Sequence, residues 1–542
     1  MPRVSFSRVI PVYLMLVALP APVRIAGEQN RGQQSTTPDR SVFDRYTQPI
    51  ELYATGLGSF TRPISSTNKE AQAFFDQGFR LMYAFGKAEA VRSFREAWKR
   101  DPDCAICYWG EAWAWGSYLN GPMTKEEAPH ALAALQKALT LKSHASPLER
   151  DFIDALSVRY VEHFDPEKRL EQDKPYAEAM RKLSEKYPND LDAATLYADA
   201  LFVMEPRRGS RDVNNPNVQR LHRVLEGILS KDVRHPGACH LYVHATESTV
   251  VPERAEACAE FLGASMPAAS HINHMPSHTW NRVGRWGDSV RANLEAWHSD
   301  LKAASGEGVA IYPEHNLHML LYAASYDGQG AIAMQAGKDH AKRTGDTFYQ
   351  VLTLVRFGRF DEVLEVTKRP KNDIQAGLWD FAQGYAQLRQ GSPDFAKVYL
   401  ARVMKAAETS KAEFRVHTAK NLLGTIAGIL EGEIRRSEGD LKGALESFER
   451  AVACEDAMTY DEPEPLPFAA RHWLGAALLE ARQYDAAARA YREELKDHPH
   501  NGWSLLGLQQ ALTGLGTPSP DVDADLARSW ARSDTWTRTS RF

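Results

Sequence analysis

The distribution of apolar and polar positions predicts helices almost throughout the chain after residue 62. No convincing run of alternating apolar and polar residues predicts a β-strand in this part of the sequence. Short turn signals, among them GRW, GRF and EGD, precede the second helix of several predicted pairs. We therefore expect an all-α protein built as an array of antiparallel helix pairs.

Several of these pairs share a spacing of small and aromatic residues. A small residue in the first helix and alanines in the second let the two helices pack closely, and an aromatic residue or leucine fills the gap to the next pair. Five windows carry this pattern, two of them loosely: 71–104 with Gly78, Ala90, Phe94, Ala97 and Pro102; 425–458 with Gly432, Ala444, Phe448 and Ala451; 468–501 with Gly475, Ala487, Tyr491 and Pro499; 377–410 with Gly384, Ala396 and Leu400; and 270–303 with Ser289, Asn293 and Ala296.

With these residues the chain resembles the tetratricopeptide-repeat superfamily over most of residues 65–515. The resemblance implies a right-handed superhelical array of helix pairs with a concave face, and such faces usually bind a protein or peptide partner. We expect four regions in the folded part: N-terminal repeats over 63–230, histidine-rich central repeats over 231–335, C-terminal repeats over 336–517, and a capping helix and tail over 518–542.

Composition and charge narrow the classes of protein. At 542 residues the chain is too long for one ordinary core, and its 43% hydrophobic and 25% charged content excludes bulk disorder. A net charge of −5 argues against a nucleic-acid partner held by bulk charge. The phosphate-binding pattern G-x-x-x-x-G-K-[ST] is absent from the sequence, so we expect no nucleotide cofactor.

The N-terminal residues predict export. Arg3 and Arg8 precede an apolar run that is shorter than the roughly 20 residues of a membrane-spanning helix. Small residues follow the run, so we predict a cleaved signal peptide over 1–27 and a flexible linker over 28–62. The mature protein would then be periplasmic or secreted, without a membrane span, and an uncleaved anchor is the alternative.

The five cysteines would lie in an oxidising compartment. Cys239 and Cys258 are spaced so that a disulfide could join two antiparallel helices. Cys104 and Cys107 form a C-x-x-C motif, and the sequence has no second one, so a zinc ribbon is excluded. A redox-active Cys104–Cys107 pair remains an alternative, and Cys454 is left over.

Histidine is concentrated in one region of the chain. Nine of the 18 histidines lie within 235–318, where an even distribution would place about three. Eight of these nine lie in three segments, 235–248, 271–286 and 312–322, and the ninth is His298. This concentration makes the central region the candidate functional site.

The first segment predicts two imidazoles and a carboxylate on one helix face. Pro236 suits a first helical position, and His240, His244 and Glu247 then follow at spacings of one turn. Residues of these types can bind one metal ion or ligate two neighbouring ions. The order differs from H-E-x-x-H, so a zinc-protease helix is not supported.

The second segment contains a proline that interrupts a continuous helix. We expect His271 and His274 in a loop, a helix that starts at Pro276, and His278 in its first turn. Ser277 lies beside these histidines, but no acidic partner for a Ser-His mechanism can be placed from the sequence.

The third segment starts a helix at Pro313, which places His315 and His318 on one face. The steps from His240 to His278 and from His278 to His315 are 38 and 37 residues, about one repeat each. If first helices of successive repeats line the concave side, these side chains converge from neighbouring helices about 10 Å apart.

These side chains are candidate ligands of a transition metal. Neutral imidazoles with one carboxylate suit zinc, copper, iron or manganese rather than calcium. The expected metal ligands are His240, His244, Glu247, His274, His278, His315 and His318. The residues expected to orient ligands or contact a substrate are His235, His271, Arg282 and Arg285. A hydrogen-bonded network that packs helices, and a metal-free ligand site, are the alternatives.

The same segments resemble a bacterial group of exported tetratricopeptide-like proteins that carry the motifs HPGAxHxYxHAxE and HMPSH, present here at 235–247 and 274–278. The resemblance covers roughly residues 68–335 and implies no activity. It indicates that the region is one unit.

Three functions are compatible with the sequence. We favour a binding or scaffold protein whose metal ion stiffens the central repeats, because repeat arrays usually present extended binding surfaces. The first alternative is a metal-dependent enzyme, a hydrolase or oxidoreductase, which needs an open coordination position. The second is a periplasmic metal-handling protein, which needs exposed ligands that exchange their ion. Whether the protein is an enzyme stays open at this point.

Overall fold

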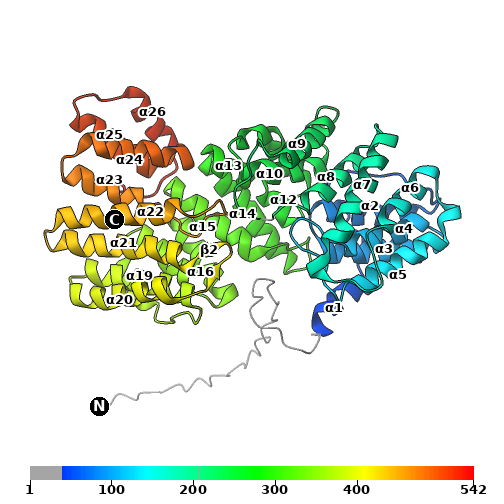
Figure 1. Cartoon of the computed structure of the whole chain (residues 1–542), viewed down its shortest axis with the longest axis horizontal. Coiled ribbons are helices and arrows are strands. Elements are labelled where there is room, and N and C mark those ends of the chain that lie inside the picture. Colours follow the sequence, from blue (N-terminus) through cyan, green and yellow to red (C-terminus); the bar gives the residue numbers. More distant parts are fainter. Residues whose placement is uncertain (1–39, 207) are drawn as a thin grey trace, which may run out of the picture. The chain divides into compact units, whose positions relative to one another are not determined.

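The computed structural model describes residues 40–206 and 208–542. The predicted signal peptide over 1–27 and the first part of the predicted linker lie outside these residues. The described residues form one compact unit, and Figure 1 shows their helices coloured in sequence order. No helix among the described residues is long and apolar enough to cross a lipid bilayer.

The described chain is mostly helical (Figure 1). The N-terminal helices are α1 (Arg40–Thr47), α2 (Lys69–Tyr83), α3 (Lys87–Arg100), α4 (Ala105–Trp115), α5 (Ala128–Thr140), η1 (Lys142–His144), α6 (Pro147–Ser157), η2 (Pro166–Lys168), α7 (Leu170–Lys186), α8 (Leu191–Phe202) and α9 (Pro216–Leu229). The central helices are α10 (Pro236–Glu247), η3 (Pro252–Ala255), α11 (Glu256–Ser265), α12 (Ser270–His274), α13 (Pro276–Val283), α14 (Trp286–Ala303) and α15 (Pro313–Asp327). The C-terminal elements are α16 (Gly330–Thr344), α17 (Phe348–Arg356), α18 (Phe360–Glu365), α19 (Asp373–Arg389), α20 (Pro393–Thr409), β1 (Glu413–Phe414), β2 (His417–Thr418), α21 (Ala419–Ser437), α22 (Leu441–Asp456), α23 (Arg471–Glu480), α24 (Tyr484–Asp497), α25 (Gly502–Gly514) and α26 (Pro520–Ser529).

Consecutive helices pack in pairs, such as α2 with α3, α4 with α5, α19 with α20 and α21 with α22. This packing confirms the predicted all-α array of helix pairs. The small residues of the repeat pattern lie where the two helices of a pair meet. A Cβ on Gly432 would lie 2.4 Å from the Phe448 ring, and a Cβ on Gly475 would lie 2.3 Å from the Tyr491 ring. Glycine at these positions therefore lets each helix approach its partner across the aromatic ring.

One short hairpin departs from the helical pattern. β1 and β2 pair antiparallel, with Glu413 opposite Thr418 and Phe414 opposite His417. Two residues per strand are too few to produce a period-2 signal in the sequence. Arg415, in the turn between them, has a φ of 57°, and its side chain reaches the functional site described below.

Residues 40–62 pack against the N-terminal helices, although the sequence predicted a flexible linker there. Tyr46 and Leu57 are buried. Arg62 forms ion pairs with Asp190 at 3.0 Å and Asp192 at 2.5 Å, which ties this segment to the start of α8. Local composition does not reveal these contacts, because the partners lie far along the chain.

Two large hydrophobic cores account for most of the buried apolar residues. The first extends over residues of α2 to α12, and the second extends from α14 to α25. Among the described residues, the predicted central region 231–335 has no large core of its own. Its helices α10 and α12 contribute to the first core, and α15 contributes to the second. The histidine-rich helices therefore lie where the two cores meet.

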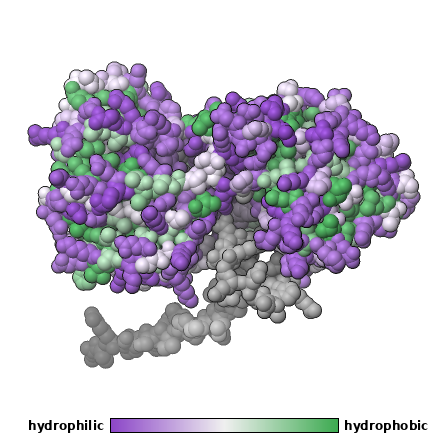
Figure 2. Space-filling model, viewed as in Figure 1, coloured by the Kyte–Doolittle hydropathy of each residue, from purple (hydrophilic) through white to green (hydrophobic). Residues whose placement is uncertain are grey.

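The C-terminal residues end in contact with the repeats. α26 lies within the predicted capping region 518–542. The following tail is packed rather than loose: the Tyr385 hydroxyl donates to the carbonyl oxygen of Phe542 at 2.7 Å, and Arg541 pairs with Glu433 at 3.0 Å. The face visible in Figure 2 is largely hydrophilic, with apolar side chains in separate groups, as amphipathic helices produce.

Candidate metal centre

Helices α10, α12, α13 and α15 bring the histidine-rich segments together. Three of them begin at the prolines that predicted their starts, Pro236, Pro276 and Pro313, because proline suits a first helical position that needs no N–H donor. His240 and His244 lie one turn apart on α10, and both side chains are buried.

The loop predicted for His271 and His274 is wrong, because both residues are helical. They lie in α12, and Met275 keeps helical backbone angles (φ −52°, ψ −38°) directly before α13. A residue before proline usually avoids these angles, which is why the sequence favoured a loop. As a result His271, His274 and His278 follow one another at helical spacing along α12 and α13.

The first triad consists of His240, His244 and His271, whose ligand atoms lie within 4.8 Å of one another. Nε2 of His240 lies 3.1 Å from Nε2 of His271. Nδ1 of His240 lies 2.6 Å from the carbonyl oxygen of Tyr83. A carbonyl oxygen only accepts, so Nδ1 carries the proton and Nε2 of the neutral ring carries the lone pair. Phe85 covers the triad, with its ring centroid 4.1 Å from that of His240.

The second triad consists of His274, His278 and His315. Nε2 of His278 lies 2.9 Å from Nε2 of His274. Nδ1 of His274 lies 3.2 Å from Oδ1 of Asn293, whose amide nitrogen donates to the carbonyl oxygen of Ser289 at 2.9 Å. Since Asn293 thereby offers its oxygen to His274, Nδ1 of His274 donates and Nε2 carries the lone pair.

Two buried carboxylates, Glu247 and Glu462, lie between the triads. Oε1 of Glu247 is 2.7 Å from Nδ1 of His244, and Oε2 of Glu247 contacts Nδ1 of His278. Oε2 of Glu462 lies 3.4 Å from Nδ1 of His278 and 3.8 Å from Nδ1 of His244. Tyr460 donates its hydroxyl to Oε2 of Glu247 at 2.8 Å. The two imidazoles and two carboxylates form a third group with ligand atoms within 4.8 Å.

The hydrogen bonds of the second triad point two lone-pair nitrogens at each other. Nδ1 of His278 faces carboxylate oxygens, so Nε2 of the neutral ring carries its lone pair. This lone pair and that of His274 then meet at 2.9 Å, and a proton or a metal ion must lie between them. Imidazole nitrogens bound about 2.0–2.1 Å from one ion lie about 2.9–3.4 Å apart at angles of about 90–110°. The separation of 3.1 Å between His240 and His271 and that of 2.9 Å between His274 and His278 fit this range.

Burial keeps the imidazoles in the neutral form that binds metals. The pKa of His271 is well below its usual value because of burial and then because of the neighbouring His240. Burial and the neighbouring His278 lower the pKa of His274 in the same way, and burial lowers the pKa of His315. Neutral imidazole is the ligand form, so the triads are prepared for metal ions.

Tyr460 and Glu462 belong to the segment between α22 and α23, which a buried ion-pair network holds in place. Asp461 pairs with Arg208 at 2.7 Å and with Arg415 at 2.6 Å, and it lies 3.2 Å from Nε2 of His417. Burial raises the pKa of Asp461, but Arg415, the hydrogen bond with His417 and Arg208 together outweigh it, so the pKa lies below its usual value. The β-hairpin thus positions the segment that brings Glu462 to the centre.

The sequence analysis missed Tyr460 and Glu462. They lie more than 200 residues from Glu247, and they stand in the acidic stretch YDEPEP, which has no histidine and no ligand spacing. Nothing in the sequence pattern links this stretch to the central histidines, so the pairing emerges only from the packing of distant segments.

Four other predicted site residues lie elsewhere or play a different part. His318 belongs to none of the three groups: its Nδ1 lies 3.2 Å from the Tyr349 hydroxyl. His235 caps α10 and lies 3.2 Å from Asp192. Arg285, directly before α14, forms ion pairs with Glu260 of α11 at 2.8 Å and with Asp288 of α14 at 2.6 Å. His271, expected to orient ligands, is part of the first triad.

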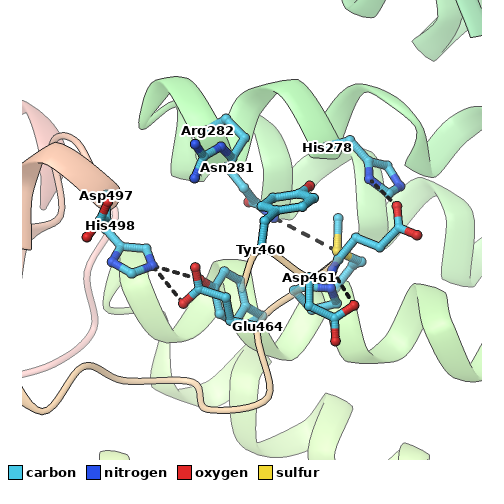
Figure 3. A pocket seen from close by; sticks show the side chains of 12 residues that line it. His278, Asn281, Arg282, Tyr460, Asp461, Glu464, Asp497 and His498 are labelled. Atoms are coloured by element: carbon cyan, nitrogen blue, oxygen red, sulfur yellow. Dashed lines mark hydrogen bonds and ion pairs between the residues drawn. The ribbon is translucent and has the colours of Figure 1, made fainter. Parts of the chain in front are cut away.

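Arg282 lines a small cavity beside the second triad, with a volume of about 20 Å³. Such a volume holds about one water molecule. In Figure 3 the segment that carries Tyr460, Asp461 and Glu464 runs past the helix that carries His278 and Arg282. The guanidinium of Arg282 lies 5.3 Å from the centroid of the Tyr460 ring. A small ligand at the second triad would therefore meet polar and charged side chains.

Two disulfides lie among the described residues. One joins Cys239 of α10 to Cys258 of α11, with a Cα–Cα distance of 4.8 Å. The other joins Cys104 and Cys107 at the start of α4. The first connects the helix of His240 and His244 to its neighbour.

No family model and no curated protein sequence matches the chain. Several solved structures are similar to it at low identity. The APC/C hetero-tetramer Cut9–Hcn1 shares 14% identity over 85% of this chain and 76% of that chain, with a TM-score of 0.29. The human IFIT1 dimer with m7Gppp-AAAA shares 10% identity over 79% and 90% of the two chains, with a TM-score of 0.30. The P58(IPK) TPR domain shares 14% identity over 85% and 99%, with a TM-score of 0.21. These similarities carry no argument about function, which rests on the geometry of the site.

Proposed function

We propose that this protein is a helical-repeat binding protein that holds transition-metal ions in its buried histidine centre. The observation that carries the proposal is the pair of lone-pair nitrogens 2.9 Å apart on His274 and His278. One proton shared between the two nitrogens is enough to explain this single contact. A metal ion also uses the third imidazole of the triad. In the first triad, the lone-pair nitrogen Nε2 of His240 lies 3.1 Å from Nε2 of His271.

The position of the centre suggests what the ion does for the fold. Its ligands come from α10 and α12, which belong to the first hydrophobic core, and from α15, which belongs to the second. An ion at this junction would cross-link the two halves of the repeat array. The array would then present a stiff concave face to a protein or peptide partner, as the tetratricopeptide-like arrangement implies.

Export to the periplasm or beyond remains part of the proposal. The disulfides Cys104–Cys107 and Cys239–Cys258 support it, because disulfides persist in oxidising compartments and are rare in the cytosol. Processing of the full-length chain tests this point: mass spectrometry of protein from an extracytoplasmic fraction should find a mature N-terminus close to residue 27. A chain that starts at Met1 and stays in the cytosol would contradict it.

Metal content is the direct test of the proposed function. Purified wild-type protein, loaded with zinc and freed of excess by gel filtration, should retain zinc in elemental analysis. The double variant His240→Ala/His278→Ala should lose most of it. His222→Ala and His340→Ala are matched controls, because both side chains are buried and neither belongs to a triad. Equal metal content in all four proteins would end the proposal.

A metal-dependent enzyme is the second candidate, and the number of ligands favours it. Each triad supplies three imidazoles, whereas structural zinc sites usually have four protein ligands and catalytic sites keep one position open. The cavity beside His278 adds room for a water molecule. Azide added to the cobalt-loaded protein should change its visible spectrum if a position is open. An unchanged spectrum would remove this candidate.

A metal-handling role receives less support. That role needs ligands from which an ion exchanges readily, whereas the side chains of five triad histidines are buried and only His315 is partly exposed. Buried ligands exchange ions slowly because the surrounding helices must open first.

A further inference from the structure

We infer that the centre holds two metal ions, one in each triad, and that Glu247 is the carboxylate that positions a histidine of each. This inference rests on the proposed function. It also replaces the ligand role that the sequence suggested for Glu247 with a role one step removed from the metal.

The first step concerns which nitrogen each histidine turns to the ions. His244 and His278 direct Nδ1 toward Glu247, at 2.7 Å for His244 and at shorter range for His278. An ionised carboxylate only accepts hydrogen bonds, so both Nδ1 atoms donate. Nε2 is then the metal-binding nitrogen of each ring. For His278 this nitrogen lies 2.9 Å from Nε2 of His274, inside the second triad.

The second step concerns the shared carboxylate. The two oxygens of Glu247 divide between the triads, Oε1 to His244 and Oε2 to His278. A carboxylate that accepts from the outer N–H of a ligating histidine fixes the ring orientation and raises its basicity, and losing it typically weakens metal binding about 10–100-fold. One side chain here performs this task for two sites, which couples them. The Tyr460 hydroxyl, donating to Oε2 at 2.8 Å, holds the carboxylate itself.

The third step concerns the number of ions. The ligand atoms form two all-histidine groups that have no member in common, His240, His244 and His271 against His274, His278 and His315. One ion with bonds of about 2.0–2.1 Å does not accommodate six imidazoles at the four-coordinate geometry of zinc. The mixed group of two histidines and two glutamates uses the Nδ1 atoms, which are protonated in this arrangement. It therefore serves as the hydrogen-bonded link between two sites, rather than as a third site.

Stoichiometry separates this inference from the proposed function. Zinc titration of metal-free wild-type protein, followed by elemental analysis, should give two ions per chain. His271→Ala should remove the first site and His315→Ala the second, so each variant retains one ion. No bound ion in the wild type overturns the proposed function. One ion, or three with the carboxylate group filled, overturns the two-site inference and leaves the function standing.

The positioning role of Glu247 has its own readout. Glu247→Gln should still bind two ions, with affinity lowered about 10–100-fold and with an unchanged set of cobalt absorption bands, because no ligand is lost. Glu433→Gln is the matched control: Glu433 is fully buried, ion-paired to Arg436 and Arg541, and in none of the three groups of ligand atoms. A changed cobalt spectrum in Glu247→Gln would show that Glu247 is itself a metal ligand. A metal affinity equal to that of the wild type would show that Glu247 does not position the ligating histidines. If an alanine variant does not fold, His271→Gln or His315→Gln replaces it, and the wild-type ion count still decides the number of sites.

Discussion

Removal of the Asp461 carboxylate should destabilise the protein more than any loss of a surface ion pair. The Asp461 side chain is fully buried, and its partners Arg208, Arg415 and His417 come from two other parts of the chain. Asp461→Ala leaves Arg415, which is only 13% exposed, without its carboxylate. Arg415 also donates to the carbonyl oxygens of Glu462 and Pro463, so the segment that carries Glu462 keeps these hydrogen bonds but loses the ion pair between Asp461 and Arg415.

The expected magnitude follows from burial. Removing one partner of a buried ion pair costs about 3–5 kcal/mol, because the other charge stays buried and uncompensated. Arg208 is 27% exposed and regains some hydration, so we expect the lower end, about 3 kcal/mol. The Asp461 pKa lies below its usual value. Its contribution is therefore full above about pH 4, the ordinary carboxyl pKa, and is lost as the pH falls toward the folded-state pKa.

Urea unfolding followed by circular dichroism measures this prediction. At pH 7 Asp461→Ala should lower the free energy of unfolding by about 3 kcal/mol, and the gap to the wild type should narrow as the pH falls below about 4. Asp485→Ala is the matched control, because Asp485 is 70% exposed and its partner Arg489 is 67% exposed. Such a pair contributes about 0–1 kcal/mol. If both variants lose the same small amount, the network around Asp461 does not hold the segment.

Three further predictions concern metal binding, a buried acid and helix packing. Stripping the metal with a chelator should lower the melting temperature, since an ion at 100 times its Kd adds about 2.7 kcal/mol per site; an unmoved calorimetric curve would contradict bracing by the ion. Burial raises the pKa of Asp300 to about 7, so the folded state loses stability as the pH rises from about 4 toward 7. Asp300→Asn should therefore raise the free energy of unfolding at pH 8 and change it little at pH 4. Urea unfolding at both pH values measures this, and a larger gain at pH 4 than at pH 8 would contradict it. Gly475→Ala places a Cβ 2.3 Å from the Tyr491 ring and should cost about 1–3 kcal/mol. Gly227→Ala, with open space around its Cβ, should raise the free energy of unfolding by up to about 1 kcal/mol. A similar loss of stability in both variants, measured by thermal unfolding, would refute the packing argument.

Part of the candidate site was predictable because its signals are local. Pro236, Pro276 and Pro313 mark helix starts through the fixed geometry of proline. The four-residue step from His240 to His244 places both side chains on one helix face whatever the helix packs against. These features depend only on backbone geometry over a few residues, and the helices of the structure begin where they predict.

Other parts of the site depend on contacts that no local pattern encodes. Met275 adopts helical angles before a proline because α12 and α13 both pack against α14. His318 lies on the same helix as His315, yet its ring lies against the Tyr349 ring, with the centroids 4.1 Å apart, because α17 lies beside α15. Residues 40–62 have the composition of a linker and still pack, because Arg62 forms ion pairs with Asp190, directly before α8, and with Asp192 of α8.

Residue spacing alone predicts the helix pairs, their close approach at small residues, and the placement of histidines one repeat apart. Each of these follows from steric and periodic rules that act within one or two helices. The tertiary structure decided which histidines form a triad, which nitrogen each one turns inward, and which carboxylates stand behind them. Those choices depend on where α10, α15 and the segment with Glu462 come to lie together, and only the packing of the two hydrophobic cores sets that arrangement.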